Sequence, residues 1–355
     1  TRKPFPALAA HLADRARIQD PSAQTHRLTL DRNLQTALET LASEGIAGQG
    51  DRLQIALVVA EHQTGEILAS VGSAGFTEDA RAGFVDMTQA LRSPGSTLKP
   101  LVYGLAFDEG LAHPETLIED RPTNFNGYQP QNFDRHFRGT IRLREALQQS
   151  LNIPVVALTE ALGPARLLTA LDKAGVKYDM PPGQPGLAIA LGGMGVTLQD
   201  MVQLYAAIAR GGATLPLRWR TDTPHEEGQR LLATTSAWFV GDILAGLAPP
   251  PGAPQNRLAY KTGTSYGYRD AWALGSTPGY TLGVWIGRPD GSPIANALAG
   301  AREARHDASM TASYDVIVIG SGAAGLTEQE LRILEKIAAG LPNKQIGREL
   351  DIAEG

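Results

Sequence analysis

Two residues near position 100 have the types and the spacing of a catalytic pair. In the stretch LRSPGSTLKPLVYGLA, Ser96 and Lys99 stand three residues apart at the start of an apolar run. Residues i and i+3 share one face of a helix, so the lysine amine would lie within reach of the serine hydroxyl. A serine is a useful nucleophile when a base takes its proton, and a lysine can be that base when burial or a nearby positive charge lowers its pKa. The alternative is a surface pair in the first turn of an ordinary helix.

A second short motif follows in the stretch QQSLNIP, which contains Ser150 and Asn152 near a predicted helix break. A serine and an asparagine at such a break could direct a hydroxyl and an amide into a cleft. The alternative is that the two residues only mark the end of a helix, because both residue types favour helix ends.

A third motif lies in the stretch LAYKTGTSYGYRDAW, at the end of an apolar run that predicts a strand. Its residues are Lys261, Thr262, Gly263 and Thr264. The glycine would let a ligand or another backbone approach closely. The lysine and the two threonines could bind a carboxylate and line an extended peptide. The alternative is an edge strand that runs into a turn.

The composition leaves room for a large enzyme and argues against several other classes. The chain has 355 residues, 43% of them hydrophobic, which is enough for one large or two ordinary domains. Its net charge of −5 gives no reason to expect a nucleic-acid-binding surface. It contains no cysteine, and its seven histidines show no metal-ligand spacing, so we expect neither a disulfide nor a metal site. No run of about 18 apolar residues predicts a membrane span, and we expect the chain itself to be soluble.

The elements that must position these motifs can be predicted from the hydrophobic pattern. Residues 1–30 look polar and loop-like, and a helix is predicted over Leu30–Ile46. The apolar runs Ile55–Val59 and Ile67–Val71 flank a turn and predict a hairpin. The remaining predictions are helices over 140–163, broken around Asn152-Ile153-Pro154, and over 196–212, and strands over 258–264, 270–275 and 280–287. Strands at both ends with helices between them predict one sheet that joins the termini of a single domain.

The three motifs occur in the order S-x-x-K, S-x-N, K-T-G, which is typical of penicillin-binding proteins and class A β-lactamases. Leu151 stands where the β-lactamase motif has an aspartate, which favours the transpeptidases. The surrounding stretches resemble the transpeptidase domain of class A (bifunctional) penicillin-binding proteins, and their sequences are most similar to the 1C type. These stretches are TGEILASVGS, RSPGSTLKPLVYGLA, YQPQNFDRHFRGTIRLREALQQSLNIPVVAL, ALGGMGVTLQDMVQLYAAIARGG and KTGTSYGYRDAWALG. The resemblance runs from about Thr1 to about Arg302.

The resemblance implies a fold and a domain organisation. The fold would be α+β and serine β-lactamase-like, with an antiparallel sheet of about five strands flanked by helices and an α-helical subdomain. Residues 1–50 would form an N-terminal linker segment and first helix, 51–302 the transpeptidase domain, and 303–355 a composite tail. Family members carry a glycosyltransferase domain and a membrane anchor before this region and a helix that closes on the sheet after it. We expect all three parts to be missing. Without the closing helix, we expect the sheet to expose apolar surface.

The resemblance also implies a role for each motif residue in forming an acyl-enzyme. Ser96 would attack the penultimate D-Ala carbonyl of a peptidoglycan stem peptide, with Lys99 as its base. Ser150 would relay a proton to the leaving amine, and Asn152 would hold Lys99 and the substrate amide. The positive charge of Lys261 would favour deprotonation of this group.

The remaining implied contacts concern the substrate. Thr262 and Thr264 would bind its terminal carboxylate beside Gly263, and the backbone N–H groups of Ser96 and Thr264 would form the oxyanion hole. No metal or organic cofactor is implied. The partners would be stem peptides and β-lactam antibiotics, at the periplasmic face of the bacterial inner membrane.

The tail resembles the openings of two other domains. The stretch SYDVIVIGSGAAGL, with Gly320, Gly322 and Gly325, resembles the first strand and turn of a flavin- or NAD-binding Rossmann unit, but no second strand or ribose-binding acid follows. The stretch LTEQELRILEKIAAGLPNKQIGRELDIAEG resembles the start of a LuxR-type helix-turn-helix and ends where the recognition helix should begin. We therefore expect the chain to bind neither FAD, NAD nor duplex DNA.

Three alternatives remain open beside a D,D-transpeptidase. The first is a β-lactam-acylated sensor or binding module with the same Ser96 chemistry and no productive transfer. The second is a flavin- or DNA-binding fusion argued from the tail alone. The third, a β-lactamase, is disfavoured because no loop glutamate can be identified that would activate a deacylating water. Penicillin labelling and stem-peptide cross-linking separate these classes.

Overall fold

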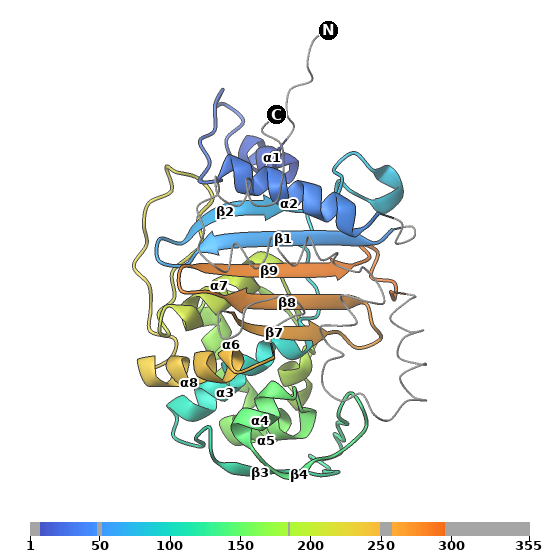
Figure 1. Ribbon diagram of the computed structural model, residues 1–355, viewed down its shortest axis with the longest axis vertical. Helices are drawn as coiled ribbons and strands as arrows, with labels where there is room; N and C mark the ends of the chain where they lie inside the picture. The colour runs from blue at the N-terminus through green and yellow to red at the C-terminus, as the bar shows by residue number, and fades with distance from the viewer. Residues whose placement is uncertain (1–7, 48–51, 184, 249–257, 295–355) are drawn as a thin grey trace.

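The computed structural model of the protein describes residues 8–47, 52–183, 185–248 and 258–294 (Figure 1). Its centre is a five-stranded antiparallel sheet in the order β2-β1-β9-β8-β7. The strands are β1 (Gln54–Glu61), β2 (Glu66–Val71), β7 (Ala259–Thr264), β8 (Asp270–Ser276) and β9 (Tyr280–Gly287). The predicted hairpin, the three later strands and the sheet that joins early and late segments are therefore confirmed.

The alternation of side chains along β1 shows how the sheet separates two apolar cores. Ile55, Leu57 and Val59 pack in one cluster with α2 (Arg32–Gly45), because side chains at every second position point to the same face. Ala56 and Val58 pack in the other cluster, together with α7 (Leu198–Ala209) and α3 (Lys99–Asp108). The predicted helices over 30–46 and 196–212 are thus confirmed on opposite faces of one sheet.

The helical layer on the α7 side carries two of the three motifs. It consists of α3, α4 (Leu143–Gln148), α5 (Asn152–Leu162), α6 (Pro164–Lys173), α7, α8 (Thr234–Ala245) and the 3-10 turns η2 (Gly95–Leu98) and η3 (Leu187–Leu191). At the end remote from the sheet, β3 (Leu117–Asp120) pairs with β4 (Gly139–Arg142) (Figure 1). A further small pair joins β5 (Tyr178–Asp179) to β6 (Gly195–Val196), and η1 (Asp79–Arg81) follows β2. The first motif lies in η2 and α3, and the second runs from the connection after α4 to Asn152, the first residue of α5.

The structure corrects the prediction that residues 1–30 are loop-like. Helix α1 runs over Ala10–Gln19 and buries His11, Leu12 and Ala16. Its buried face contains few apolar side chains, and charged residues occupy much of the rest of the helix. The sequence therefore lacks the broad periodic apolar pattern that predicts a helix.

The predicted helix over 140–163 is also corrected in detail. Its first residues belong to β4, and the break lies over 149–151 rather than at Asn152-Ile153-Pro154. Pro154 falls in the first turn of α5, where a missing N–H costs no hydrogen bond, so the proline does not interrupt the helix. Helices α6 and α8 had not been predicted.

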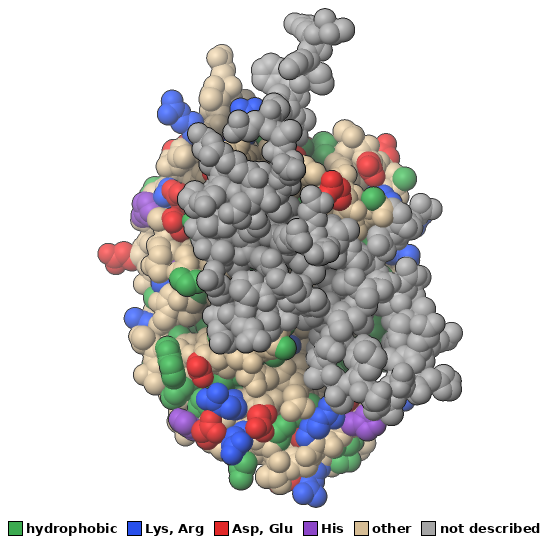
Figure 2. Space-filling model, viewed as in Figure 1, with side chains coloured by type: hydrophobic (Ala, Val, Ile, Leu, Met, Phe, Trp, Pro, Cys, Tyr) green, Lys and Arg blue, Asp and Glu red, His purple; other side chains and the backbone are tan. Residues whose placement is uncertain are grey.

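Within the described ranges, no single helix is long and apolar enough to cross a membrane, and one pair, α5 and α6, passes by length and composition but bends by 86°. The face in Figure 2 shows acidic and basic side chains mixed at the β3–β4 end. There Glu115 pairs with Arg142 and Arg144, and Arg144 also pairs with Asp242. The segment after Ile294, where the closing helix and both tail resemblances would fall, lies outside the described residues.

Candidate functional site

Ser96 lies in the 3-10 turn η2, immediately before α3 begins at Lys99. In such a turn, side chains at i and i+3 lie above one another. That the Lys99 amine lies within reach of the Ser96 hydroxyl stays a prediction. The turn is fixed from both sides of the serine. Thr97 donates its N–H and its hydroxyl to Pro94 O, and the buried Tyr205 hydroxyl on α7 donates to Thr97 O at 2.8 Å. Ser96 itself is half-buried.

Lys99 is fully buried, and its ammonium nitrogen lies among oxygen atoms of the second motif. Lys99 Nζ donates to Ser150 O at 2.5 Å, to Asn152 Oδ1 at 2.7 Å and to Leu151 O at 3.1 Å. Ser150 Oγ is a fourth oxygen, at 3.4 Å. Three close acceptors match the three N–H bonds of a lysine ammonium, which accounts for a charged side chain in this interior. The S-x-x-K and S-x-N motifs therefore meet in space.

The backbone conformation of Ser150 creates this set of acceptors. Ser150 has a φ of 56°, in the left-handed region that residues with a side chain seldom adopt. Such a residue costs about 1–2 kcal/mol, so the surrounding structure must hold it in place. Here the N–H groups of Ser150 and Leu151 close the end of α4 on Leu147 O and Ala146 O, while their carbonyl groups accept from Lys99.

The side-chain amide of Asn152 is held at both ends. Its Nδ2 donates to Gln131 O at 2.6 Å, which leaves Oδ1 facing Lys99 Nζ. Its backbone N–H donates to Asn132 Oδ1 at 2.7 Å. Asn132 had not been singled out in the sequence, although it lies in one of the stretches that carried the resemblance. No motif pattern marks it.

The third motif approaches the first because two glycines let β7 and η2 touch. A Cβ at Gly263 would lie 2.7 Å from Pro94 O and 2.8 Å from Thr97 N. A Cβ at Gly95, which has a φ of 52°, would lie 2.5 Å from Thr264 O. Since real Cβ atoms do not approach backbone atoms this closely, only glycine fits at either position. The K-T-G strand therefore lies directly against the turn that carries Ser96.

We expect Gly263→Ala to separate β7 from η2. The added methyl would meet backbone atoms that cannot rotate away, so the free energy of unfolding should fall by about 1–3 kcal/mol, as in overpacked cores. The rate of covalent penicillin labelling should fall as well, because Ser96 and Thr264 move apart. Thermal unfolding and labelling kinetics measure the two effects. Gly279→Ala is the matched control, since a Cβ there meets nothing within 4 Å; equal behaviour of the two variants would contradict the close-contact argument.

The turn that follows the third motif is tied to the sheet by Asp270, a buried carboxyl group. It accepts hydrogen bonds from Ser265 Oγ at 2.9 Å and Trp285 Nε1 at 3.0 Å. Burial raises the pKa of Asp270, and these hydrogen bonds oppose that rise. Two residues further along β8, Trp272 Nε1 donates to Ser93 O at 2.8 Å, which links the sheet to the segment before Ser96.

Lys261 and Gly263 lie on the sheet face that packs toward α3. They stand opposite Leu274 and Trp272 in the β7–β8 register, and both of these residues belong to the core that includes α3. Lys261 is 2% exposed and its Nζ donates to Thr262 O at 2.8 Å. Thr262 and Thr264 occupy the alternate positions of the same edge strand. Among the described residues, no group of three or more His, Asp and Glu side chains could hold a metal ion.

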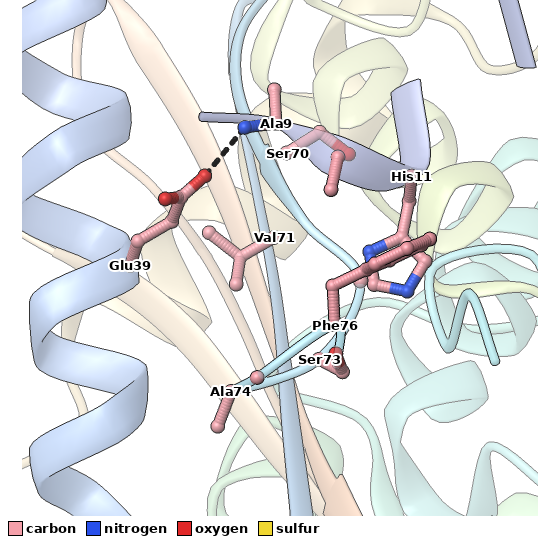
Figure 3. A pocket seen from close by; sticks show the side chains of 11 residues that line it. Ala9, His11, Glu39, Ser70, Val71, Ser73, Ala74 and Phe76 are labelled. Carbon is pink, nitrogen blue, oxygen red and sulfur yellow. Dashed lines mark hydrogen bonds between the residues drawn. The ribbon is translucent and has the colours of Figure 1, made fainter. Parts of the chain in front are cut away.

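A cavity of about 90 Å³ lies away from these motifs, beside the opposite edge strand β2 (Figure 3). Its lining includes His11, Glu39 and Phe76. Glu39 accepts the backbone N–H of Ala9 at 2.6 Å, and the His11 ring stands edge-on to Phe76. The cavity contains none of the motif residues, and its Glu39 carboxylate attaches the start of α1.

The arrangement just described agrees with comparisons to known proteins. Residues 55–288 match the family described as "Penicillin binding protein transpeptidase domain". The chain belongs to this family. The match covers every motif residue, from Ser96 to Thr264, and the expected α+β fold with its five-stranded antiparallel sheet is confirmed.

Several relatives show the same similarity. Penicillin-binding protein 1C of Escherichia coli is 45% identical over 271 residues, which cover 75% of this chain and 35% of that protein. Penicillin-binding protein 1B of Vibrio cholerae is 32% identical over 69% of this chain and 34% of its own length. The chain thus spans about a third of these relatives. A solved structure of the PonA1 protein from Mycobacterium tuberculosis, in complex with penicillin V, superposes with a TM-score of 0.71 at 22% sequence identity. The match covers 92% of this chain and 92% of the PonA1 chain.

The tail also has a family match. Residues 324–355 match the description "Bacterial regulatory proteins, luxR family", which confirms the LuxR-type resemblance. These residues lie outside the part of the chain that the structure describes.

Proposed function

We propose that this domain is a serine D,D-transpeptidase that cross-links peptidoglycan stem peptides through an acyl-enzyme on Ser96. The observation that carries the proposal is the position of Lys99. Its nitrogen is fully buried, three residues after Ser96, and lies within 3.4 Å of four oxygens of the Ser-x-Asn motif. A lysine between two serines can pass a proton from one to the other, which is what acyl transfer requires.

The first half of the proposed reaction forms the acyl-enzyme. Lys99 first releases one ammonium proton to solvent. The neutral amine then takes the proton of the Ser96 hydroxyl as Ser96 Oγ bonds to the penultimate D-Ala carbonyl carbon. The backbone N–H groups of Ser96 and Thr264 stabilise the oxyanion, a role supported by the close approach of Gly95 to Thr264. The C–N bond then breaks, Ser150 passes a proton from Lys99 to the leaving nitrogen, and D-Ala departs.

The second half transfers the acyl group to an amine. The amine of a neighbouring stem attacks the ester carbonyl, gives its proton to Lys99 through Ser150, and the Ser96 oxygen leaves and regains a proton. The acyl group ends in a new amide bond, so one peptide bond replaces another. Asn152, held by Gln131 O, keeps Lys99 in place during both halves.

Mass spectrometry after incubation with penicillin tests the acyl-enzyme. The proposal requires one penicilloyl adduct, on the peptide that contains Ser96. Incubation with two stem peptides then tests transfer: a cross-linked product supports a transpeptidase. A stable adduct without any cross-link would favour the penicillin-acylated sensor or binding module, which shares the same buried lysine.

We expect Lys261→Ala to weaken acylation most for ligands that bear a carboxylate. Lys261 is the buried cation of the strand that lies against η2, so its loss removes positive charge beside the proposed carboxylate site. The measurement compares acylation by a β-lactam free acid with acylation by its ester. Lys173→Ala, at the exposed end of α6, is the control for lysine loss. An equal loss for acid and ester would remove the carboxylate role from Lys261.

A further inference from the structure

A series of buried and partly buried hydrogen bonds leads away from the candidate site to a carboxyl group that no motif includes. Lys99 Nζ donates to Asn152 Oδ1, and the backbone N–H of Asn152 donates to Asn132 Oδ1. Asn132 Nδ2 donates in turn to both oxygens of Asp120, at 2.9 Å each, and to His136 O at 2.8 Å. Asp120 is fully buried and Asn132 is 3% exposed, so neither side chain can touch a substrate.

The hydrogen-bond donors and acceptors of Asp120, Asn132 and Asn152 match one another in only one arrangement. Asp120 accepts from Asn132 Nδ2 and from the backbone N–H of Arg138 at 2.7 Å, as an acceptor-only carboxylate does. The carboxylate therefore holds the amino end of the Asn132 amide. The carbonyl end is left for the N–H of Asn152, the first residue of α5. Within the described residues, Asp120 forms no ion pair that would compete with this arrangement.

The side chain of Asn132 supports the start of α5 by accepting the backbone N–H of Asn152. The residue before the helix, Leu151, provides no side-chain cap, and the N–H of Asn152 would otherwise be one of the unsatisfied donors of the first turn. The charge of Asp120 also reaches α3: burial is the main reason that the pKa of Tyr103 is raised, and Asp120 raises it further. Tyr103 lies one helical turn after Lys99.

We infer that Asp120 and Asn132 are positioning residues that set the place of Asn152, and through it the place of Lys99, for acyl transfer. The inference rests on the proposed function for its kinetic meaning. A shift of about 1 Å in a catalytic group can cost about a hundredfold in rate, so a small movement at the start of α5 is enough to matter. The competing explanation is that the pair only caps α5 and contributes to stability alone.

Single variants break the order of donors and acceptors in opposite ways. In Asp120→Asn, the carboxamide must accept from the Arg138 N–H, so its amino group faces the amino group of Asn132 and two donors meet. In Asn132→Asp, two buried carboxyl groups face each other. The double variant Asp120→Asn with Asn132→Asp restores the contact between the two positions, because the carboxamide at 120 donates to the carboxylate at 132, which still accepts from Asn152. It does not restore the contact with His136 O, which then faces a carboxylate oxygen.

The test measures the first-order rate of Ser96 acylation at saturating penicillin and, separately, the non-covalent affinity. Each single variant should lower the rate by about tenfold to a hundredfold, with little change in affinity, since the chemistry and not the binding surface is disturbed. The double variant should recover part of the loss. Asp134→Asn is the control, an exposed carboxylate of the same loop that pairs with Arg138, and should leave the rate unchanged.

A second readout does not depend on acylation. In protein labelled with nitrogen-15 at asparagine, the side-chain amide signal of Asn152 should move in each single variant and return part of the way in the double variant. Wild-type acylation rates in Asp120→Asn, or an Asn152 signal that does not move, would overturn the inference and leave the pair a helix cap. An unaltered protein that never labels, with an Asn152 signal that moves and returns as expected, would contradict the proposed function while supporting the positioning of Asn152.

Discussion

We expect Ser96→Ala to abolish covalent labelling by penicillin, from one adduct per chain to none. The β-lactam carbonyl can be opened only by a nucleophile beside an activating base, and in this fold the buried Lys99 begins α3 directly after the turn that carries Ser96. Alanine removes only the hydroxyl oxygen, and the hydrogen bonds that fix η2 are made by Pro94, Thr97 and Tyr205. The folded state should therefore keep its thermal midpoint. Intact-mass spectrometry with peptide mapping measures the result.

Ser93→Ala is the matched control, three residues earlier in the same segment. Its hydroxyl donates to Gly192 O, so it has a structural partner and no lysine three residues on. We expect this variant to reach one adduct per chain, with a change in rate at most. An adduct that persists in Ser96→Ala, or that disappears only in Ser93→Ala, would place the nucleophile elsewhere and remove the basis of the proposed reaction.

The sheet could be predicted because its strands carry local signals. The β1–β2 hairpin has two apolar runs around a turn, and β7, β8 and β9 are separated by Gly-containing or Pro-containing turns. Helix α1 could not be predicted in the same way. It buries Leu12 and Ala16 along a narrow stripe, and its place depends on packing against the rest of the domain rather than on its own pattern.

The candidate site could be predicted by residue type but not by geometry. Motif order places a serine, a lysine and an asparagine in the chain, yet two of the acceptors that surround Lys99 Nζ are backbone carbonyls of Ser150 and Leu151. Their direction depends on a left-handed φ at Ser150, which no residue preference signals for serine. The pairing of Asp120 with Asn132 joins a strand end to a loop, and such non-periodic contacts leave no trace in a single sequence.

We expect Lys99→Arg to lower the rate of acylation by about two orders of magnitude or more, the scale of lost general-base help. An arginine keeps the positive charge but does not release a proton in proteins, so it cannot take the proton of Ser96. The planar guanidinium also differs in shape from the ammonium that makes three convergent contacts to Ser150 O, Leu151 O and Asn152 Oδ1 from a fully buried position. The rate is measured by stopped-flow or quenched mass spectrometry with excess penicillin.

Lys99→Met separates the two possible roles of this side chain, charge and base. Methionine fills a similar volume but supplies neither a charge nor a proton acceptor, and it leaves the oxygens around Nζ without their donor. If Lys99 is the base, both variants should acylate at a similarly low rate. If the charge alone matters, Lys99→Arg should acylate far faster than Lys99→Met. An arginine variant that is as fast as the unaltered protein would make Lys99 a structural cation, and Ser96 would then need a different base within the site.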